Sequence, residues 1–176
     1  MNEIQIKNIR SGVGKYQAIM GDYWNTDVTR NARFQKQFNG FYRIRQRAPE
    51  WYAHYYEMLE AVKSQDKTFL DLLTEFNGRC DRVEASFISK LYATRNPEYP
   101  IIDTWVLKNI GLALPHTYAL NRIAKIDHLY QRIVEWYAAR VASEAGRECV
   151  RQFDAVCPDC LITAVKKIDF ILWQSR

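Results

Sequence analysis

The sequence predicts an all-α fold of about eight helices. Apolar residues recur at helical spacing in nearly every segment, whereas the apolar–polar alternation of a strand is scarce. The chain of 176 residues holds 7 glycines and 5 prolines, which favours long helices over a turn-rich β fold. Hydrophobic residues make up 48% of the chain and aromatic residues 14%, as in a well-packed protein. Because there is no repeat or Pro/Ser-rich linker, we expect a single helical domain over residues 1–176.

The first 48 residues show the least regular pattern. Residues 4–19 are expected to form a helix that is interrupted at the Ser-Gly-Val-Gly sequence of residues 11–14. Residues 23–27 have the composition of a loop or a helix entry. A helix is expected over residues 31–46. Its inward-facing residues are Phe34, Phe38, Phe41 and Tyr42.

The rest of the chain contains seven segments in which apolar residues recur at helical spacing. Pro49 suits the first turn of the first of these helices, because a backbone N–H at that position would have no hydrogen-bond partner within the helix. Gly78 is predicted to cap the second helix, and Gly111 and Pro115 are predicted to stop the fourth. The expected helices cover residues 50–64, 67–76, 83–93, 104–112, 120–142, 144–155 and 160–173.

Asp103 stands at the mouth of a helix. The dipeptides Asn96-Pro97 and Tyr99-Pro100 end the preceding helix, because a residue before proline is pushed out of the α region. Asp103 then precedes a helical run, so its carboxylate is placed to accept a backbone N–H of the first turn. Two interpretations follow: Asp103 is only an N-cap, or its carboxylate also serves a reaction.

A resemblance to a known family bears on the second interpretation. Residues 101–108, Ile-Ile-Asp-Thr-Trp-Val-Leu-Lys, resemble the segment that carries the catalytic aspartate in the helix-hairpin-helix DNA glycosylase superfamily. Residues 82–92 and 167–173 are similar to two helices of the bacterial 8-oxoguanine-glycosylase-like proteins, an uncharacterised branch. The resemblance implies a DNA-glycosylase-like fold, DNA as partner, a part in DNA repair, and Asp103 as the catalytic carboxylate.

The hairpin of this chain departs from the pattern of that superfamily. The usual Leu-Pro-Gly-Val-Gly is replaced by Asn-Gly-Arg-Cys-Asp-Arg over residues 77–82. The resemblance makes Gly78, Arg79 and Arg82 candidate phosphate contacts, although the acidic Asp81 between them would repel phosphate. The lysine of bifunctional members has no match near Val83 or Glu84, and Lys90 lies too far along its helix to be carried over. The implied activity is therefore that of a monofunctional N-glycosylase without a cofactor.

The charge pattern suits a polyanionic partner. The formal net charge is +5 and the pI about 9.0. Residues 30–47 interleave basic and aromatic side chains, which suit phosphate pairing and base stacking. The alternative is an amphipathic helix whose basic face only meets solvent. The candidate nucleic-acid contacts outside the hairpin are Arg30, Arg33, Lys36, Arg43, Arg45 and, one turn beyond Asp103, Lys108.

Other site types have incomplete motifs. Residues 11–16 lack the full phosphate-loop pattern. Cys149, Cys157 and Cys160 fall one ligand short of a four-cysteine site, so we expect no metal. Without a signal peptide or an 18-residue apolar run, we expect a cytoplasmic protein with free thiols and no membrane contact.

Three functions are thus open. The first is a base-excision glycosylase that uses Asp103, and the second is a catalytically inactive binding or regulatory module of the same fold. The third is an unrelated helical interaction protein in which the motif match is accidental. Whether Asp103 lines a basic, concave pocket distinguishes among them.

Overall fold

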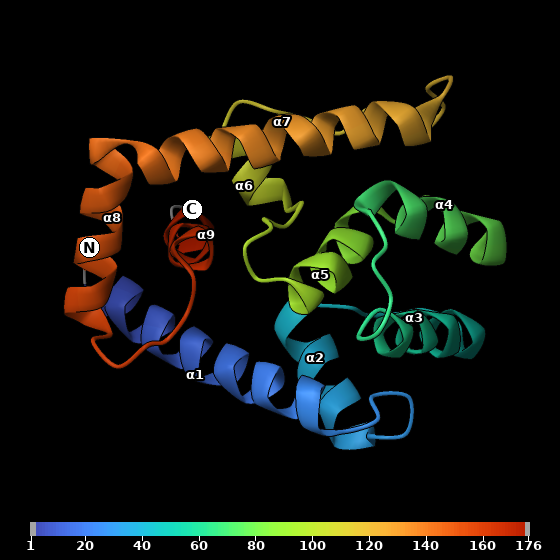
Figure 1. Ribbon diagram of the computed structural model, residues 1–176, viewed down its shortest axis with the longest axis horizontal. Coiled ribbons are helices and arrows are strands. Elements are labelled where there is room, and N and C mark those ends of the chain that lie inside the picture. Colours follow the sequence, from blue (N-terminus) through green and yellow to red (C-terminus); the bar gives the residue numbers. More distant parts are fainter. Residues whose placement is uncertain (1–2, 175–176) are drawn as a thin grey trace.

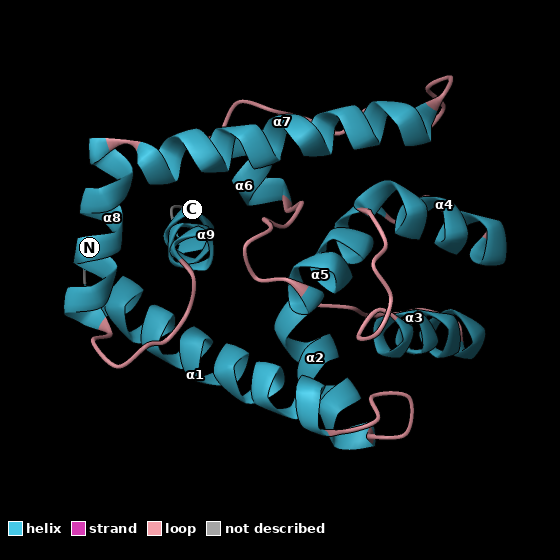
Figure 2. Ribbon diagram, in the orientation of Figure 1, coloured by secondary structure: helices cyan, strands magenta, loops and turns pink. Residues whose placement is uncertain are grey.

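The computed structural model describes the backbone of residues 3–174 and the side chains of residues 6–173. Over this range the chain forms nine helices and no strand (Figure 2), which confirms the all-α prediction. The helices are α1 (Glu3–Asn25), α2 (Ala32–Tyr42), α3 (Pro49–Ala61), α4 (Phe69–Cys80), α5 (Ala85–Arg95), α6 (Thr104–Asn109), α7 (Arg122–Ala142), α8 (Glu144–Val156) and α9 (Ala164–Gln174).

The C-terminal helix α9 occupies the middle of one half of the molecule. In Figure 1 it is seen nearly end-on, with α1, α8 and α7 around it and with α6 beside it. The other half holds α2 to α5, whose buried residues form the larger hydrophobic cluster together with α7. A smaller cluster joins α1, α8 and α9 around Phe153 and Phe170. Residues of α2 and of the C-terminal helix α9 meet those of α5 and α6 at one place.

Helix α1 is continuous, so the predicted interruption at residues 11–14 is wrong, and residues 23–25 belong to this helix rather than to a loop. Gly12 lies where α9 approaches closely, since a Cβ there would stand 3.0 Å from the ring of Phe170. A Cβ at Gly14 would meet no atom within 4 Å. Glycine in a helix interior costs about 1 kcal/mol relative to alanine, which the packing of a 23-residue helix offsets.

Three predicted helix ends need correction. Helix α2 stops at Tyr42, because Arg43 adopts a left-handed conformation with φ 56°. Helix α4 runs through Gly78 to Cys80, and the left-handed cap is Asp81, so Gly78 is not a C-cap. Helix α9 begins at Ala164, four residues later than predicted, because residues 157–163 form the connection from α8.

The expectation of four free thiols is also wrong. Cys157 and Cys160 form a disulfide in the turn after α8, where their Cα atoms lie 5.5 Å apart, a separation that a disulfide spans. Cys80 and Cys149 are free. Within the described part of the chain, no cluster of three or more His, Cys, Asp or Glu side chains is arranged to hold a metal ion.

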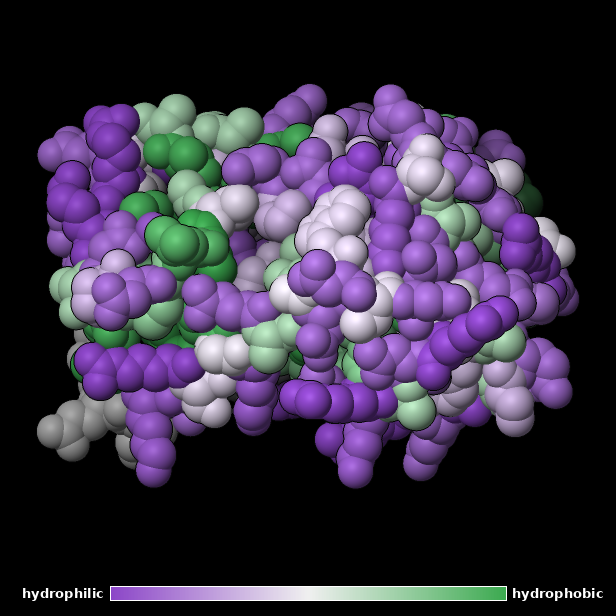
Figure 3. All heavy atoms as spheres, turned by 60° about the horizontal axis from the view of Figure 1, so that its bottom comes forward, coloured by the Kyte–Doolittle hydropathy of each residue, from purple (hydrophilic) through white to green (hydrophobic). Residues whose placement is uncertain are grey.

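The outer surface next to α1 is mainly polar. Figure 3 turns the bottom of Figure 1, where α1 and α2 lie, toward the viewer, and hydrophilic side chains cover most of that face. No described helix has the length and apolar character that crossing a membrane requires.

Candidate active site

The loop that leads to Asp103 (residues 96–103, the Asp103 loop) is held by hydrogen bonds from two helices, α5 and α7. The N–H of Ile102 donates to Ser89 Oγ at 2.8 Å, and Ser86 Oγ donates to the carbonyl of Ile102 at 2.8 Å. The hydroxyl of Tyr130 on α7 donates to the carbonyl of Pro100 at 2.9 Å. Both backbone groups of Ile102 are therefore satisfied by α5, which fixes the position of the next residue relative to that helix.

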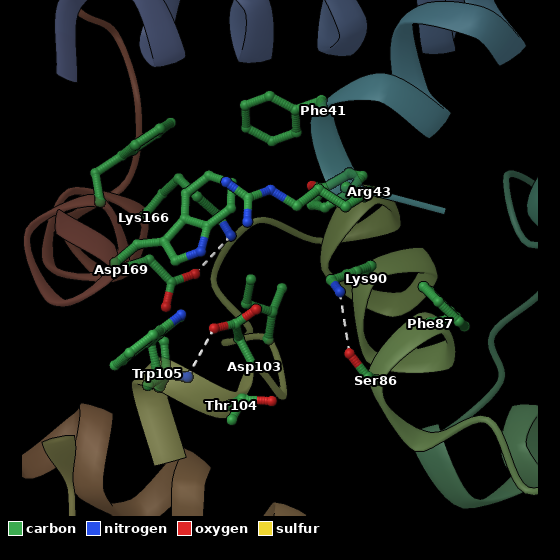
Figure 4. Close-up of a pocket in the computed structure, with 15 residues that line it drawn as sticks. Phe41, Arg43, Ser86, Phe87, Lys90, Asp103, Thr104, Trp105, Lys166 and Asp169 are labelled. Carbon is green, nitrogen blue, oxygen red and sulfur yellow. Dashed lines mark hydrogen bonds and ion pairs between the residues drawn. The ribbon is translucent and has the colours of Figure 1, made fainter. Parts of the chain in front are cut away.

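Asp103 caps α6 and also lines a pocket. Its Oδ1 accepts the N–H of Trp105 at 2.9 Å, as the sequence predicts for an N-cap. The carboxylate also borders a pocket of about 290 Å³ between α2, α5, α6 and α9, hereafter the Asp103 pocket (Figure 4). One capping bond leaves acceptor sites of the carboxylate available to a molecule in the pocket.

Lys90 reaches the Asp103 pocket from α5. Its Nζ donates to Ser86 Oγ at 3.0 Å, and Figure 4 shows the amine and the Asp103 carboxylate facing the same space. Lys90 is 6% exposed, and this burial lowers its pKa from the ordinary 10.5 to about 8. The Asp103 carboxylate opposes that shift, whereas the positive charges of Lys166 and Arg43 add to it.

A second buried lysine, Lys166, lies on the α9 side of the pocket, and its pKa is shifted in the opposite direction from that of Lys90. Lys166 Nζ donates to Asp169 Oδ2 at 2.8 Å, and the hydroxyl of Tyr137 donates to Asp169 Oδ1. Burial is the largest single influence and disfavours the charged form of Lys166, but the Asp169 carboxylate together with Tyr42 and Tyr16 outweighs it and raises the pKa of Lys166. The pocket thus contains one lysine that is held protonated and one, Lys90, that loses its proton readily.

The walls of the pocket are largely aromatic. They include Phe41 from α2, Phe87 from α5, Trp105 from α6, and Phe170 and Trp173 from α9. At the rim, the guanidinium carbon of the exposed Arg43 lies 5.9 Å from the centroid of the Trp173 ring. Aromatic walls with a few polar groups suit a flat, partly polar ring as ligand.

The predicted basic residues fall into separate places. Arg43 lines the Asp103 pocket, and Arg33 and Lys36 line a neighbouring groove between α1 and α2. Arg30 is exposed and paired with an aspartate outside both cavities, and Arg45 is exposed outside them. Lys108 is exposed, with its Nζ 5.3 Å from the centroid of the Trp105 ring.

The hairpin residues form no part of the pocket lining. Gly78 lies inside α4, and Arg79 is paired with Glu75 at 2.8 Å and with Glu57 at 3.7 Å. Arg82 is exposed and borders a different, smaller cavity together with Arg79. The structure therefore brings Arg43 to Asp103 and leaves Gly78, Arg79 and Arg82 apart from it.

Sequence reasoning missed three pocket residues, Lys90, Lys166 and Asp169. One signal for Lys90 was present, because Lys90 follows Phe87 by three residues and lies on the apolar stripe of its helix. A lysine at such a position is either buried or reaches out to solvent along its stem, and only the packing decides between these.

Comparison with protein-family models, with curated protein sequences and with solved structures found no match to this chain. The interpretation of the site therefore depends on its own residues and geometry.

Proposed function

We propose that the chain is a nucleic-acid N-glycosylase that releases a base bound in the Asp103 pocket. The observation that carries the proposal is that a carboxylate, Asp103, and an amine of lowered pKa, Lys90, line one aromatic-walled pocket. Active sites for acid–base and nucleophilic catalysis typically contain neighbouring ionisable groups whose pKa values the local environment shifts away from each other. The similarity of residues 101–108 to the glycosylase motif supports the same assignment.

Asp103 has the electrostatic role in this reaction. When the bond between C1′ and the base nitrogen breaks, its electron pair leaves with the base and positive charge develops on the sugar. A fixed carboxylate stabilises that charge, most effectively where water is largely excluded. The N-cap bond to Trp105 and the hydrogen bonds to Ile102 hold the carboxylate in place before the reaction begins.

Lys90 is the proposed nucleophile, which makes the enzyme bifunctional rather than monofunctional. Lowering its pKa from 10.5 to about 8 raises the neutral fraction of the amine near neutral pH by about 300-fold. The amine bonds to C1′ as the base departs and loses a proton, and the base takes up a proton from solvent. The C1′–O4′ bond then opens, O4′ keeps the electron pair and takes up the remaining proton of the Lys90 nitrogen, and an imine between Lys90 and C1′ of the sugar results.

The remaining pocket groups would select and orient the base. Phe41, Trp105 and Trp173 offer faces for stacking, and the extruded base needs such contacts in place of its neighbours. The Lys166–Asp169 pair provides a charged donor and an acceptor for a polar base edge. Arg43 is placed at the rim, where a phosphate of the same nucleotide would lie.

The test uses DNA oligonucleotides with damaged bases, both single-stranded and duplex, in the presence of borohydride. The expected result is a covalent protein–DNA adduct that Lys90→Gln abolishes and Asp103→Asn slows by at least about 100-fold. The matched control is Lys125→Gln, which changes an exposed lysine of α7 outside the pocket and should leave trapping unchanged. Equal trapping by wild type and Asp103→Asn would remove Asp103 from the mechanism.

A second candidate is a binding module of the same kind without catalysis. It is favoured by the hairpin, where Arg79 is engaged by Glu75 and Glu57 rather than free to meet phosphate. Binding of DNA without base release from any substrate would support this candidate. If the chain neither binds DNA nor releases a base, the third function, a helical interaction protein, remains as the explanation.

A further inference from the structure

A large groove between α1 and α2, hereafter the α1–α2 groove, adjoins the Asp103 pocket. Its volume is about 1020 Å³. Helix α1 contributes one wall, with Ser11, Gly14 and Lys15, and helix α2 contributes the other, with Arg33, Lys36 and Gln37. Small residues on both helices keep the groove open, and at Gly14 and Gly40 a Cβ would meet nothing within 4 Å.

The groove carries unbalanced positive charge. Its ionisable lining residues are all basic, namely Lys15, Arg33, Lys36 and Arg43. None of these four forms an ion pair with a side chain that the structure describes. By contrast, Arg30 close by in sequence is paired with Asp27. Four cations along one groove without acidic partners complement a chain of phosphates.

The groove opens onto the Asp103 pocket. Phe41, Arg43 and Trp173 line both cavities, so a molecule that fills the groove can continue into the pocket past their side chains. In Figure 4, Phe41 and Arg43 extend from α2 over the space that Asp103 and Lys90 face.

The width of the groove decides which form of nucleic acid fits. Helices α1 and α2 pack directly on each other, and the axes of packed helices lie roughly 8–10 Å apart. A duplex is too broad to lie between helices at this spacing, since its major groove alone is about 12 Å wide. A single strand is narrower than a duplex, and a basic groove with aromatic side chains is the usual means of holding one.

We propose that the α1–α2 groove binds single-stranded DNA that continues from the nucleotide in the Asp103 pocket. This inference rests on the proposed function and adds the substrate class, a strand that is unpaired next to the target base. The phosphates lie along Lys15, Arg33 and Lys36, and Arg43 stands at the passage from the groove to the pocket.

Charge insertion at an open position gives the sharpest test. A Cβ at Gly14 meets nothing within 4 Å, so Gly14→Glu adds a carboxylate at an open position of the groove and Gly14→Gln adds the same bulk without charge. The matched control is Gly21→Glu on the same helix, where a Cβ also meets nothing within 4 Å and which lies outside the groove. Affinity is measured by fluorescence anisotropy with a short labelled single strand of undamaged DNA and with the blunt duplex of the same sequence.

Gly14→Glu is expected to weaken single-strand binding by at least about tenfold, while Gly14→Gln and Gly21→Glu stay within about threefold of wild type. The double variant Arg33→Ala/Lys36→Ala should flatten the log–log salt dependence by about 1.4, since each phosphate contact on a single strand contributes about 0.7. The wild-type protein should bind the single strand more tightly than the blunt duplex.

Equal binding by Gly14→Glu and Gly21→Glu would overturn the proposal, as would a preference for the blunt duplex. Undamaged DNA separates this test from that of the proposed function. If Gly14→Glu abolishes single-strand binding and no substrate loses its base, the groove proposal stands and the glycosylase proposal fails. Base release from duplex that Gly14→Glu leaves unchanged keeps the glycosylase and defeats the groove.

Discussion

Replacing Lys90 with Met should stabilise the fold near neutral pH, and the gain should shrink as the pH rises. Lys90 is 6% exposed, and burial lowers its pKa from 10.5 to about 8 despite the nearby Asp103 carboxylate. In the unfolded chain the amine keeps its ordinary pKa. Between pH of about 8 and 10.5 the unfolded chain therefore holds more protons than the folded one, so wild-type stability rises with pH across that window.

The size of the effect follows from the same two values. Below both pKa values, keeping a charged Lys90 buried costs the folded state about 3 kcal/mol, because one pKa unit corresponds to about 1.4 kcal/mol. At a pH of about 9.5 that cost has fallen to about 1 kcal/mol. A methionine has a similar shape and no charge, so the advantage of Lys90→Met should narrow by about 2 kcal/mol from pH 6.5 to 9.5.

Urea unfolding of wild type and Lys90→Met at the two pH values measures this difference, in which the titration of all other groups largely cancels. Lys108→Met serves as control, because it makes the same change at an exposed lysine outside the Asp103 pocket. A Lys90→Met protein that is less stable than wild type at both pH values, by the same amount, would refute the reasoning. It would mean that the amine is favourably charged in the pocket, and Lys90 would then be a poor nucleophile.

Three further predictions concern the surroundings of the pocket, and urea unfolding measures each. Ser89→Ala removes the acceptor of a buried N–H in the Asp103 loop and should cost about 1–3 kcal/mol, so an unchanged stability would mean that this bond does not hold the loop. Lys166→Met leaves Asp169 buried without its cation and should cost about 3–5 kcal/mol, and a gain in stability would contradict that expectation. Gly14→Ala should stabilise α1 by about 0.5–1 kcal/mol, whereas Gly12→Ala should gain less because its Cβ would stand 3.0 Å from a ring of α9, and equal gains would refute the close approach there.

Most helices were predictable because their apolar stripes are long. The stripe of α7 runs over six turns, and Ile126, Tyr130, Ile133 and Tyr137 are all buried as its period predicts. The ends were harder to predict because they depend on local backbone choices that several residue types tolerate. At the end of α4 the left-handed position is taken by Asp81, although a glycine was available three residues earlier.

The glycines of α1 show why composition misleads about interruptions. A glycine weakens a helix only by its own propensity, and a neighbouring helix that packs closely can more than offset the loss. Gly12 lies against Phe170, a residue 158 positions away in the chain, so the reason for the glycine is a tertiary contact. No local pattern distinguishes such a glycine from one that breaks a helix.

The candidate site was predictable only as far as its local part extends. Asp103 follows from two Pro-bounded turns and a helix start, which are features of one short segment. Lys166 and Asp169 come to the pocket because α9 packs beside α6, and this depends on the packing of the whole chain. A lysine and an aspartate three residues apart on a helix are most often a surface pair, so the pattern alone does not predict their burial.

Two surfaces of the molecule differ in how their charges are balanced, and this bears on where nucleic acid would approach. At the hairpin between α4 and α5, Arg79 is engaged by two glutamates, and Glu84 of the hairpin is paired with Arg47 from the α2–α3 connection, so these two arginines have acidic partners within 4 Å. In the α1–α2 groove, Lys15 and Arg33 have no such partners among the described residues. Seen from a distance of about a Debye length, the two charges of a close ion pair cancel each other. An approaching polyanion is therefore attracted mainly by basic side chains that have no acidic partner nearby. For the proposed single strand, this charge balance favours entry along α1 and α2 over entry at the hairpin.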